Sequence, residues 1–321
     1  MKIHRLGTYA TGFKYYKNKI EITNNDEIEK IKLLKIPPAY DNVTIINNPK
    51  IIAFGYDSKN RKQVLYNPKF IAKQNAKKYD KISASIKFFS KLKKKIATDL
   101  GGGSSSGSGG DEKTLAIAVI LTLIFTCGFR IGNKKYEKEN NSVGLTTLKY
   151  KHLKFEKNNK ILIDFIGKKG VRNIATCDNL KIYDYLNTKF KNVATAATTA
   201  ATATAKMEDY IFSYGAENSK VITSSDVNEY LRTISKRYSK DIIITTKDLR
   251  TWNANMLFLT FFKKLRKARR GEENRDTEKI VNKDVKRAIE MVAEKLHNSY
   301  SICKKSYIDP KIIENAIKEI K

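Results

Sequence analysis

The sequence predicts an α+β fold in which a β-containing N-terminal domain precedes a mainly α-helical domain that includes a small β-sheet. Three observations predict it: a strand-turn-strand pattern around residue 60, helical periodicity through most of the chain after residue 110, and short alternating runs between residues 150 and 175. The 321 residues suffice for two domains, which we place at residues 1–80 and 81–321.

The strand-turn-strand pattern lies in IIAFGYDSKNRKQVLYN, where we expect strands at 51–56 and 62–66 and a polar turn at 57–60. Residues 70–95 are rich in lysine but keep apolar residues at helical spacing. We therefore expect helical structure there, with one face packed against the protein and the other exposed to solvent. The packed face consists of Ile82, Ile86, Phe89 and Leu92.

Residues 111–129 form the most apolar segment of the chain, and they begin with acidic residues that suit a helix N-terminus. We expect a central core helix, because an apolar run of about 15 residues is too short to span a bilayer. Residues 150–175 contain the turn-forming sequences NN and KKG between alternating runs, which indicates a small sheet.

Three further helices are predicted at 226–238, 247–270 and 282–296. In the last of these, Asn282 suits the N-cap position. Its apolar face is formed by Val285, Ile289, Val292, Ala293 and Leu296.

Two stretches differ from the rest of the chain. Residues 101–110, GGGSSSGSGG, form a Gly/Ser tether, and residues 194–205, ATAATTAATATA, contain only alanine and threonine. We interpret both as engineered or filler loops and leave them out of functional reasoning.

Charge is the most informative feature of the composition. The 63 Lys and Arg against 33 Asp and Glu give a net charge of +30, which favours a polyanionic partner such as nucleic acid. Abundant Lys, Asn, Ile and Tyr also fit an AT-rich genome, which would inflate the lysine count. Charge alone therefore indicates nucleic-acid binding without proving it.

Cysteine and histidine usage excludes other classes of protein. The three cysteines stand far apart in the sequence, and with only three histidines they form no zinc-site or disulfide pattern. The first residues, MKIHRLGTYATGFKYYKNK, lack the apolar core of a secretory signal. We therefore expect the protein to stay in a reducing compartment.

Five residues could carry chemistry together: Arg130 in CGFRIGN, Lys168 in the turn of FIGKKGVRN, Arg250 in TTKDLRTWNAN, Asn298 in KLHNSYSICKKSYIDP, and Tyr307 nine residues later. Phosphodiester transesterification needs this set. A tyrosine attacks the phosphate, arginines stabilise the charge of the transition state, a lysine protonates the leaving 5′-oxygen, and an asparagine donates a further hydrogen bond.

Each of these residues also has a purely structural interpretation. An arginine after a core helix can extend to solvent, lysines are common in turns, and asparagine is a common left-handed cap. Tyr307 is one of 17 tyrosines. The order Arg, Lys, Lys-x-x-Arg, Asn, Tyr is what favours the catalytic interpretation.

With these blocks, the sequence resembles the type IB DNA topoisomerases of poxviruses and bacteria. The resemblance rests on FRIGNKKYEKENNSVGLTTLKYKH, FIGKKG, TTKDLRTWNAN and SICKKSYI, and in the N-terminal part on GYDSKNRKQVLYN and NAKKYDKI. It covers nearly the whole chain apart from the two atypical stretches.

The resemblance implies a role for each residue of the set. Arg130 and Arg250 would clamp the transition state, Lys168 would be the general acid, and Tyr307 would be the nucleophile that forms a 3′-phosphotyrosine. Asn298 would donate a hydrogen bond to a phosphate oxygen.

The resemblance also implies DNA contacts outside this set. Lys247 would lie near the scissile phosphate, Gln63 and Tyr66 match positions that contact target bases in the viral enzymes, and Lys135 and Tyr136 lie in a stretch that touches DNA in them.

Two positions depart from the poxvirus pattern. The poxvirus enzymes have histidine where this chain has Asn298, whereas bacterial relatives have asparagine there. The neighbouring His297 is not the equivalent residue, because the nine-residue spacing to Tyr307 is that of Asn298. Val64 replaces an aromatic base-contacting residue, which puts a preference for a pyrimidine-rich pentamer in doubt.

The resemblance implies a C-shaped clamp around double-stranded DNA that relaxes supercoils by cleavage, strand rotation and religation. We expect a monomer that needs no ATP, metal or other cofactor and has no membrane association. The resemblance also implies an intracellular, DNA-associated protein, in a nucleus, a virion or viral factory, or a bacterial cytoplasm. Two alternatives stay open: a tyrosine recombinase, which shares the fold but usually has His-x-x-Arg where this chain has Lys247 to Arg250, and a catalytically silent DNA-binding relative.

Overall fold

The structure is a computed structural model that describes residues 2–102, 109–195, 204, 206–239, 241–272 and 277–319. Most of the Gly/Ser and Ala/Thr stretches, namely residues 103–108, 196–203 and 205, lies outside the described residues. Their interpretation as filler therefore stays a prediction. The chain divides into two compact units, Met1–Asp80 and Lys81–Lys321, which we describe separately as unit 1 and unit 2.

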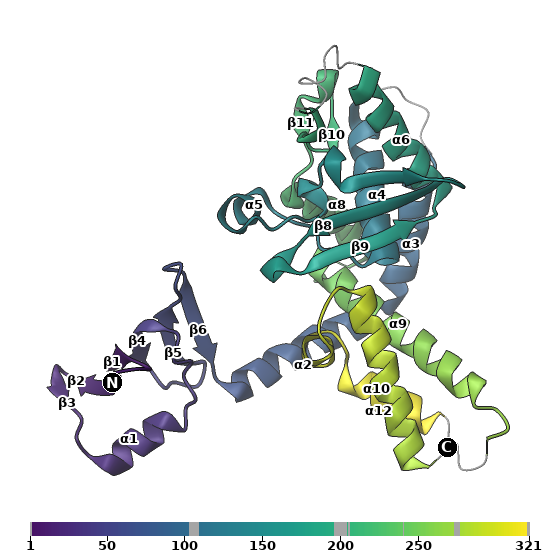
Figure 1. Cartoon of the computed structure of the whole chain (residues 1–321). Helices are drawn as coiled ribbons and strands as arrows, with labels where there is room; N and C mark the ends of the chain where they lie inside the picture. The colour runs from purple at the N-terminus through teal and green to yellow at the C-terminus, as the bar shows by residue number, and fades with distance from the viewer. Residues whose placement is uncertain are drawn as a thin grey trace. The chain divides into compact units, whose positions relative to one another are not determined.

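Unit 1 contains a six-stranded antiparallel sheet with the strand order β3-β2-β1-β4-β5-β6 (Figure 1). Its strands are β1 (Ile3–Thr8), β2 (Gly12–Lys17), β3 (Ile20–Glu21), β4 (Asp41–Ile45), β5 (Ile51–Tyr56) and β6 (Lys62–Tyr66), and helix α1 spans Asn25–Lys32. Ile31 of α1 packs with Val43, Ile45 and Ile52 of the sheet, so the helix closes the small core. The predicted strands at 51–56 and 62–66 are confirmed.

The lysine-rich segment is helical, as predicted, and it divides into two helices, α2 (Pro68–Ala84) and α3 (Ile86–Leu100). Ser85 breaks it with φ −95° and ψ 3°, and its hydroxyl donates to the carbonyl of Lys81 at 2.8 Å. Ile86 is 50% exposed instead of buried, because the break turns the apolar face of α3. That face is formed by Phe88, Phe89, Leu92, Ile96 and Leu100.

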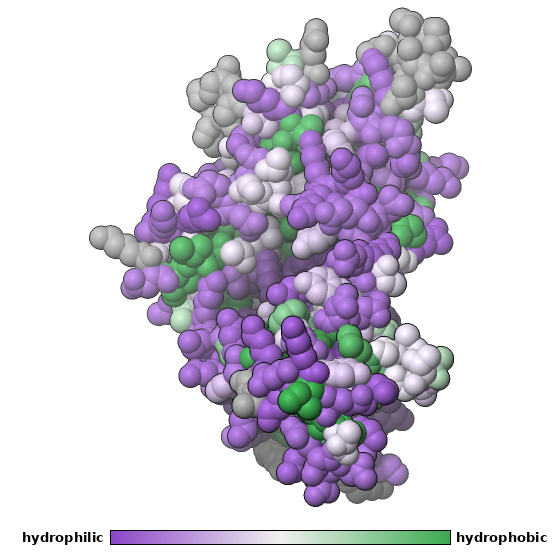
Figure 2. Space-filling view, turned by 90° about the vertical axis from the view of Figure 1, so that its left-hand side faces the viewer, coloured by the Kyte–Doolittle hydropathy of each residue, from purple (hydrophilic) through white to green (hydrophobic). Residues whose placement is uncertain are grey.

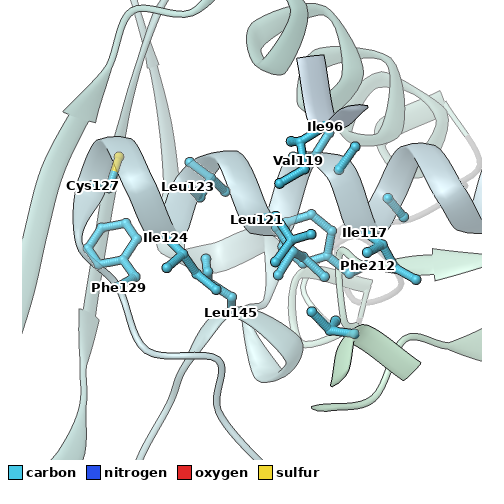
Figure 3. Close-up of a cluster of buried hydrophobic side chains, with 14 of the residues drawn as sticks. Ile96, Ile117, Val119, Leu121, Leu123, Ile124, Cys127, Phe129, Leu145 and Phe212 are labelled. Atoms are coloured by element: carbon cyan, nitrogen blue, oxygen red, sulfur yellow. The ribbon is translucent and has the colours of Figure 1, made fainter. Parts of the chain in front are cut away.

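Helix α4 (Gly109–Cys127) is the centre of unit 2, as predicted. Residues 116–121 of the helix are all buried, the pattern of a helix that is surrounded by protein on every side. Figure 3 shows Ile117, Leu121 and Ile124 of this helix among Leu145 and Phe212 from distant parts of the sequence. Among the described residues, no helix is both long and apolar enough to cross a membrane.

The predicted small sheet is confirmed as β7 (Leu153–Glu156), β8 (Lys160–Ile166) and β9 (Arg172–Cys177), paired antiparallel in that order. Ile161, Ile163 and Phe165 alternate along β8 and are buried in the main core. The hairpin between β8 and β9 closes through a 3₁₀ turn, Lys168–Gly170.

The rest of unit 2 is mainly helical (Figure 1). It comprises α5 (Lys134–Asn140), α6 (Leu180–Thr195), α8 (Ser224–Tyr238), α9 (Thr246–Ala268), α10 (Glu278–Lys295), α11 (Tyr300–Ser306) and α12 (Pro310–Lys318), with the strands β10 (Ser213–Tyr214) and β11 (Lys220–Val221). Three further 3₁₀ turns occupy Leu145–Thr147, Tyr150–His152 and Ala216–Asn218.

The helices predicted at 226–238, 247–270 and 282–296 correspond to α8, α9 and α10. Asn282 is not the N-cap of α10, which is Thr277, five residues earlier. The predicted apolar face is correct, and it joins residues of α9 and α12 in a second core cluster that includes Phe258, Ile289 and Ala316. In Figure 2, hydrophilic residues cover most of the face that is shown, as the large number of charged residues requires.

Candidate active site

Arg250 lies at the centre of the candidate site, in the first turns of α9. That helix begins with a capping box in which Thr245 and Asp248 bond to each other's backbone N–H groups. Arg250 is only 4% exposed, and its guanidinium donates to the carbonyl of Gly128 and, at 3.1 Å, to that of Leu296. It therefore joins the segment after α4 to the C-terminal end of α10.

Gly128 allows these two segments to approach each other. Its φ is +67°, and a Cβ atom at this position would lie 2.1 Å from the carbonyl oxygen of Lys295. The close approach brings Arg130, three residues after the end of α4, beside Asn298. Arg130 donates to the Asn298 side-chain oxygen at 2.5 Å.

Tyr307 stands at the C-cap of α11, the short helix that fills the interval after Asn298. The Arg250 guanidinium carbon lies 5.6 Å from the centroid of its ring. The predicted residues Arg130, Arg250, Asn298 and Tyr307 thus come together from four separate stretches of unit 2.

The charges around Tyr307 change the acidity of its phenol. Burial by itself raises the pKa of Tyr307, but the positive charges of Arg250, Arg130 and Lys168 and a hydrogen bond from Arg250 outweigh it. The net result is a pKa below the ordinary tyrosine value. A phenol in this setting gives up its proton more readily, as a nucleophile requires.

Two buried donors of the site have no hydrogen-bond partner within the described part of the chain: Nε of Arg250 and Nδ2 of Asn298. Buried polar groups are nearly always paired, because an unpaired donor costs about 1–3 kcal/mol. Both belong to the cluster around Tyr307. Their pairing capacity fits an acceptor that arrives from outside, such as a phosphate oxygen.

Lys168 is exposed in the turn between β8 and β9, as predicted. The neighbouring Lys169 has φ +63°, which makes the turn tight. Lys168 is close enough to Tyr307 for its charge to lower the pKa of the phenol. The hairpin therefore brings an exposed ammonium group to the edge of the site.

Lys247 is exposed on the first turn of α9, one turn before Arg250. Its neighbour Asp248 is buried and forms an ion pair of 2.7 Å with Lys81. Lys247 therefore lies beside the cluster without an observed contact to Tyr307.

Lys135 and Tyr136 lie on α5, and the Tyr136 side chain is 61% exposed. The helix is held to the rest of unit 2 through Glu137, which accepts a hydrogen bond from the Tyr210 hydroxyl at 2.7 Å and pairs with Lys149 at 3.4 Å. Helix α5 therefore holds the exposed side chains of Lys135 and Tyr136 on an element that is anchored to the rest of unit 2.

Gln63 and Tyr66 lie on β6 in unit 1 and are therefore not placed relative to the cluster. The Gln63 amide donates to Asp57 at 2.9 Å. Hydrogen bonds from Arg61 lower the pKa of Asp57 to about 2, so this carboxylate stays charged and holds the β5–β6 turn. Tyr66 stacks on Phe70 with ring centroids 5.8 Å apart.

Asn255 is a site residue that the sequence reasoning missed. It is fully buried on α9, and its amide donates to the backbone carbonyl of Tyr307 at 2.9 Å while its oxygen accepts from the backbone N–H of Asp309 at 2.9 Å. The sequence offered one indication of it: Asn255 lies in the same block as Arg250, TTKDLRTWNAN, five residues further on.

Among the described residues, no group of three or more His, Cys, Asp and Glu side chains is arranged to hold a metal ion. Cys127 and Cys177, distant in sequence, are brought together, and their thiols share a hydrogen bond. That bond raises the pKa of Cys127 and lowers the pKa of Cys177.

Comparison with known proteins connects this fold and site to one group. The family profile described as "Eukaryotic DNA topoisomerase I, catalytic core" matches residues 67–321, and the one described as "Bacterial DNA topoisomerase IB, N-terminal domain" matches residues 12–57. A mimivirus (Acanthamoeba polyphaga mimivirus) DNA topoisomerase 1B is 29% identical over 306 residues, which cover 92% of this chain and 81% of that protein.

The poxvirus relatives match a shorter stretch. The monkeypox virus DNA topoisomerase I and the vaccinia virus (strain Copenhagen) DNA topoisomerase 1B are each 30% identical over 161 residues, 46% of this chain and 47% of theirs. A crystal structure of XerA recombinase superimposes with a TM-score of 0.38 at 14% identity, covering 70% of this chain and 62% of that one.

The two profile matches, over the helical unit and the β-containing N-terminal unit, place the chain in the class of type IB DNA topoisomerases. The chain belongs to this family, because the catalytic-core profile matches most of its length. The predicted resemblance is confirmed, and the enzyme class is that of a DNA topoisomerase, an isomerase.

Proposed function

We propose that this chain relaxes supercoiled duplex DNA by cutting one strand with Tyr307, allowing rotation, and resealing the strand without ATP or a metal ion. One observation carries the proposal. The charge of Arg250 lies over the Tyr307 ring, in a cluster where Arg250 Nε and Asn298 Nδ2 have no hydrogen-bond partner among the described residues.

In the cleavage step, the Tyr307 oxygen attacks the scissile phosphorus and forms a new P–O bond, while the bond from phosphorus to the 5′-oxygen breaks. The positive surroundings that lower the pKa of Tyr307 favour loss of its proton. The product is a 3′-phosphotyrosine with a free 5′-hydroxyl. Bond energy is conserved in this intermediate, so resealing requires no ATP.

The transition state places extra negative charge on the non-bridging oxygens of the phosphate. Arg130 and Arg250 would hold these oxygens through forked donors that keep their charge at any relevant pH. Asn298 would add its unpaired Nδ2 donor. A neutral asparagine can donate here, but it supplies no titratable group.

The 5′-oxygen leaves readily only when it gains a proton. Lys168, exposed at the hairpin turn and close enough to influence the pKa of Tyr307, would supply that proton. In religation the 5′-hydroxyl returns its proton to Lys168 and attacks the phosphotyrosine, which releases the Tyr307 oxygen.

DNA would be bound as a duplex by a monomer that closes as a clamp, with Lys247 beside the scissile phosphate. Lys135 and Tyr136 on α5, and Gln63 and Tyr66 on β6, would contact the duplex away from the reacting phosphate. The net charge of +30 predicts affinity that falls steeply with salt as counterions are released.

The decisive experiment compares Tyr307→Phe with Tyr300→Phe, a second tyrosine on the same short helix segment. Plasmid relaxation is measured with EDTA present and ATP absent, and covalent capture is measured on a labelled duplex. We expect Tyr307→Phe to abolish both while DNA binding persists, and Tyr300→Phe to retain both. Relaxation or capture by Tyr307→Phe would refute the proposal.

The same assay separates the alternatives. A topoisomerase relaxes a plasmid as a monomer, whereas a recombinase acts on paired sites. Relaxation rates proportional to enzyme concentration on plasmids of arbitrary sequence support the proposal, and a requirement for two specific sites would favour a recombinase. Binding without capture by the unaltered chain would indicate a catalytically silent relative.

A further inference from the structure

His297 adopts a backbone conformation that histidine rarely takes. Its φ is +50°, in the left-handed region, at the point where α10 ends. Its N–H donates to the carbonyl of Glu294 at 3.1 Å, and the next N–H, of Asn298, donates to that of Ala293 at 2.9 Å. Glycine or asparagine is the usual choice for this termination, so the histidine side chain must offset a backbone cost.

The side chain makes two contacts that glycine could not make. Its Nε2 lies 3.0 Å from the backbone carbonyl oxygen of Cys127, and because a carbonyl can only accept, Nε2 must carry the proton and donate. Its ring stacks on that of Phe129, with centroids 5.2 Å apart and planes 18° apart. Both partners belong to the segment that leads to Arg130.

Three links thus join the end of α10 to the segment after α4. Arg250 bridges the carbonyls of Gly128 and Leu296, Arg130 bonds to Asn298, and His297 bonds to the residue before Gly128. The first two use groups that the proposed reaction needs for the phosphate. Among these three links in the described part of the chain, the His297 link is the one that uses no residue proposed to bind the phosphate.

We propose that His297 is a positioning residue for the reaction: by joining α10 to the Cys127–Phe129 segment, it keeps Arg130 and Asn298 at the spacing that one phosphate requires. This inference rests on the proposed function. His297 acts through its neighbours and does not touch the reacting atoms, because its Nε2 is bonded to Cys127 and its ring is stacked on Phe129.

The charges that face His297 keep it in the neutral, donating form. Burial lowers its pKa, and Arg250 from α9, Arg130 from the segment after α4, and Lys295 from α10 lower it further, against the opposing hydrogen bond to Cys127. At neutral pH the Nε2–H tautomer is therefore available to donate without adding a charge beside the two arginines.

The test uses three variants that separate the backbone from the side chain. His297→Gly removes the ring and its hydrogen-bond donor, but glycine suits the left-handed backbone. His297→Ala removes the same groups and retains the backbone strain. His297→Gln supplies an amide donor at about the position of Nε2. We expect single-turnover cleavage by His297→Gly to be about 10- to 100-fold slower, since small misplacements of reacting groups have effects of this size. His297→Gln should recover most of the loss.

Two further measurements show that the effect is positional. DNA affinity, measured in a Tyr307→Phe background to prevent cleavage, should be the same with and without His297→Gly. His297→Ala should cleave as slowly as His297→Gly but unfold at a lower temperature, because only alanine retains the strained backbone. Nitrogen-15 NMR of the imidazole, readily assigned among three histidines, should show the Nε2–H tautomer.

Wild-type cleavage by folded His297→Gly, or a Gln variant no better than Gly, would overturn the inference. If His297→Gly failed to fold, the Gln variant would decide the matter through its cleavage rate. Failure of the proposed function looks different: Tyr307→Phe would still capture DNA, whatever the His297 variants do.

Discussion

The side-chain amide of Asn255 donates a 2.9 Å hydrogen bond to the backbone carbonyl of Tyr307, and its oxygen accepts from the N–H of Asp309, also at 2.9 Å. A second bond from the same amide, to Thr251 at 2.7 Å, fixes the side chain on its own helix. The residue is fully buried. One amide therefore attaches the segment that carries the proposed nucleophile to α9, the helix that carries Arg250.

Replacing Asn255 should affect both stability and cleavage. Asn255→Ala leaves the buried carbonyl of Tyr307 and the N–H of Asp309 without this partner, which should cost about 1–3 kcal/mol for each unpaired group. Asn255→Asp keeps the acceptor but directs a carboxylate oxygen at the two carbonyls, so it should be at least as harmful. Urea unfolding and single-turnover cleavage measure the two effects, and a wild-type rate in folded Asn255→Ala would contradict the positioning role.

The pH dependence of cleavage should follow the Tyr307 phenol. Because its pKa is below the ordinary value of about 10, the phenolate forms at lower pH, and the rate should rise with pH and level off before an ordinary tyrosine would ionise. No inflection near pH 6.5 is expected, because Asn298 does not titrate and burial lowers the pKa of His297. An essential group titrating near 6.5 would contradict the assignment of Asn298.

Lys168 can be tested separately with a substrate in which sulfur replaces the leaving 5′-oxygen. A thiolate leaves without a proton, so this substrate should restore cleavage to Lys168→Ala if the lysine is the general acid. Removing its charge should also raise the pKa of Tyr307 and move the pH profile upward. Lys169→Asn, which tolerates the positive φ of its position, is the control and should change neither result.

Local patterns in the sequence predicted the elements whose signals are local. The β5–β6 hairpin follows from alternation around a polar turn, and α4 follows from an uninterrupted apolar run. The break at Ser85 could not be predicted in this way, because the helical spacing continues through it without glycine or proline. Packing of α3 against α4, which is a long-range contact, favours the turned face.

The candidate site shows the same limit. Arg130, Arg250, Asn298 and Tyr307 could be selected from residue types and order, and the structure brings them together. Asn255 could not, since an asparagine in a helix has many ordinary explanations and its partner lies 52 residues away.

Gly128 should tolerate no side chain. A Cβ there would lie 2.1 Å from the Lys295 carbonyl oxygen, in addition to the strain of a positive φ. Gly271 is the matched control, with φ +93° and open space around its Cβ position. Gly271→Ala should lower the free energy of unfolding only by the cost of the strained backbone, about 1–3 kcal/mol. Gly128→Ala should lower it by more and should also cleave slowly. Equal free energies of unfolding for the two variants would show that the α4 and α10 ends can separate without cost.

Asp284 joins α9 and α10, the two helices that lead into the site. Its carboxylate is 2% exposed and pairs with Arg266 at 3.0 Å and with Arg269 at 3.0 Å, linking α10 to the C-terminal part of α9. Asp284→Asn removes the charge that compensates the buried Arg266, which should cost about 3–5 kcal/mol in the free energy of unfolding.

The exposed pair of Glu290 with Arg287, at 3.4 Å, is the control for Asp284, and Glu290→Gln should cost less than about 1 kcal/mol. Asp284 makes no contact with Arg250 or Tyr307 among the interactions observed here, so its removal should lower the urea midpoint while leaving cleavage near normal at temperatures where the variant is folded. If cleavage by folded Asp284→Asn fell as far as cleavage by Asn255→Ala, the far end of the α9–α10 pair would also set the geometry of the site. The slow cleavage expected of Asn255→Ala could then not be attributed to its own hydrogen bonds to the Tyr307 segment.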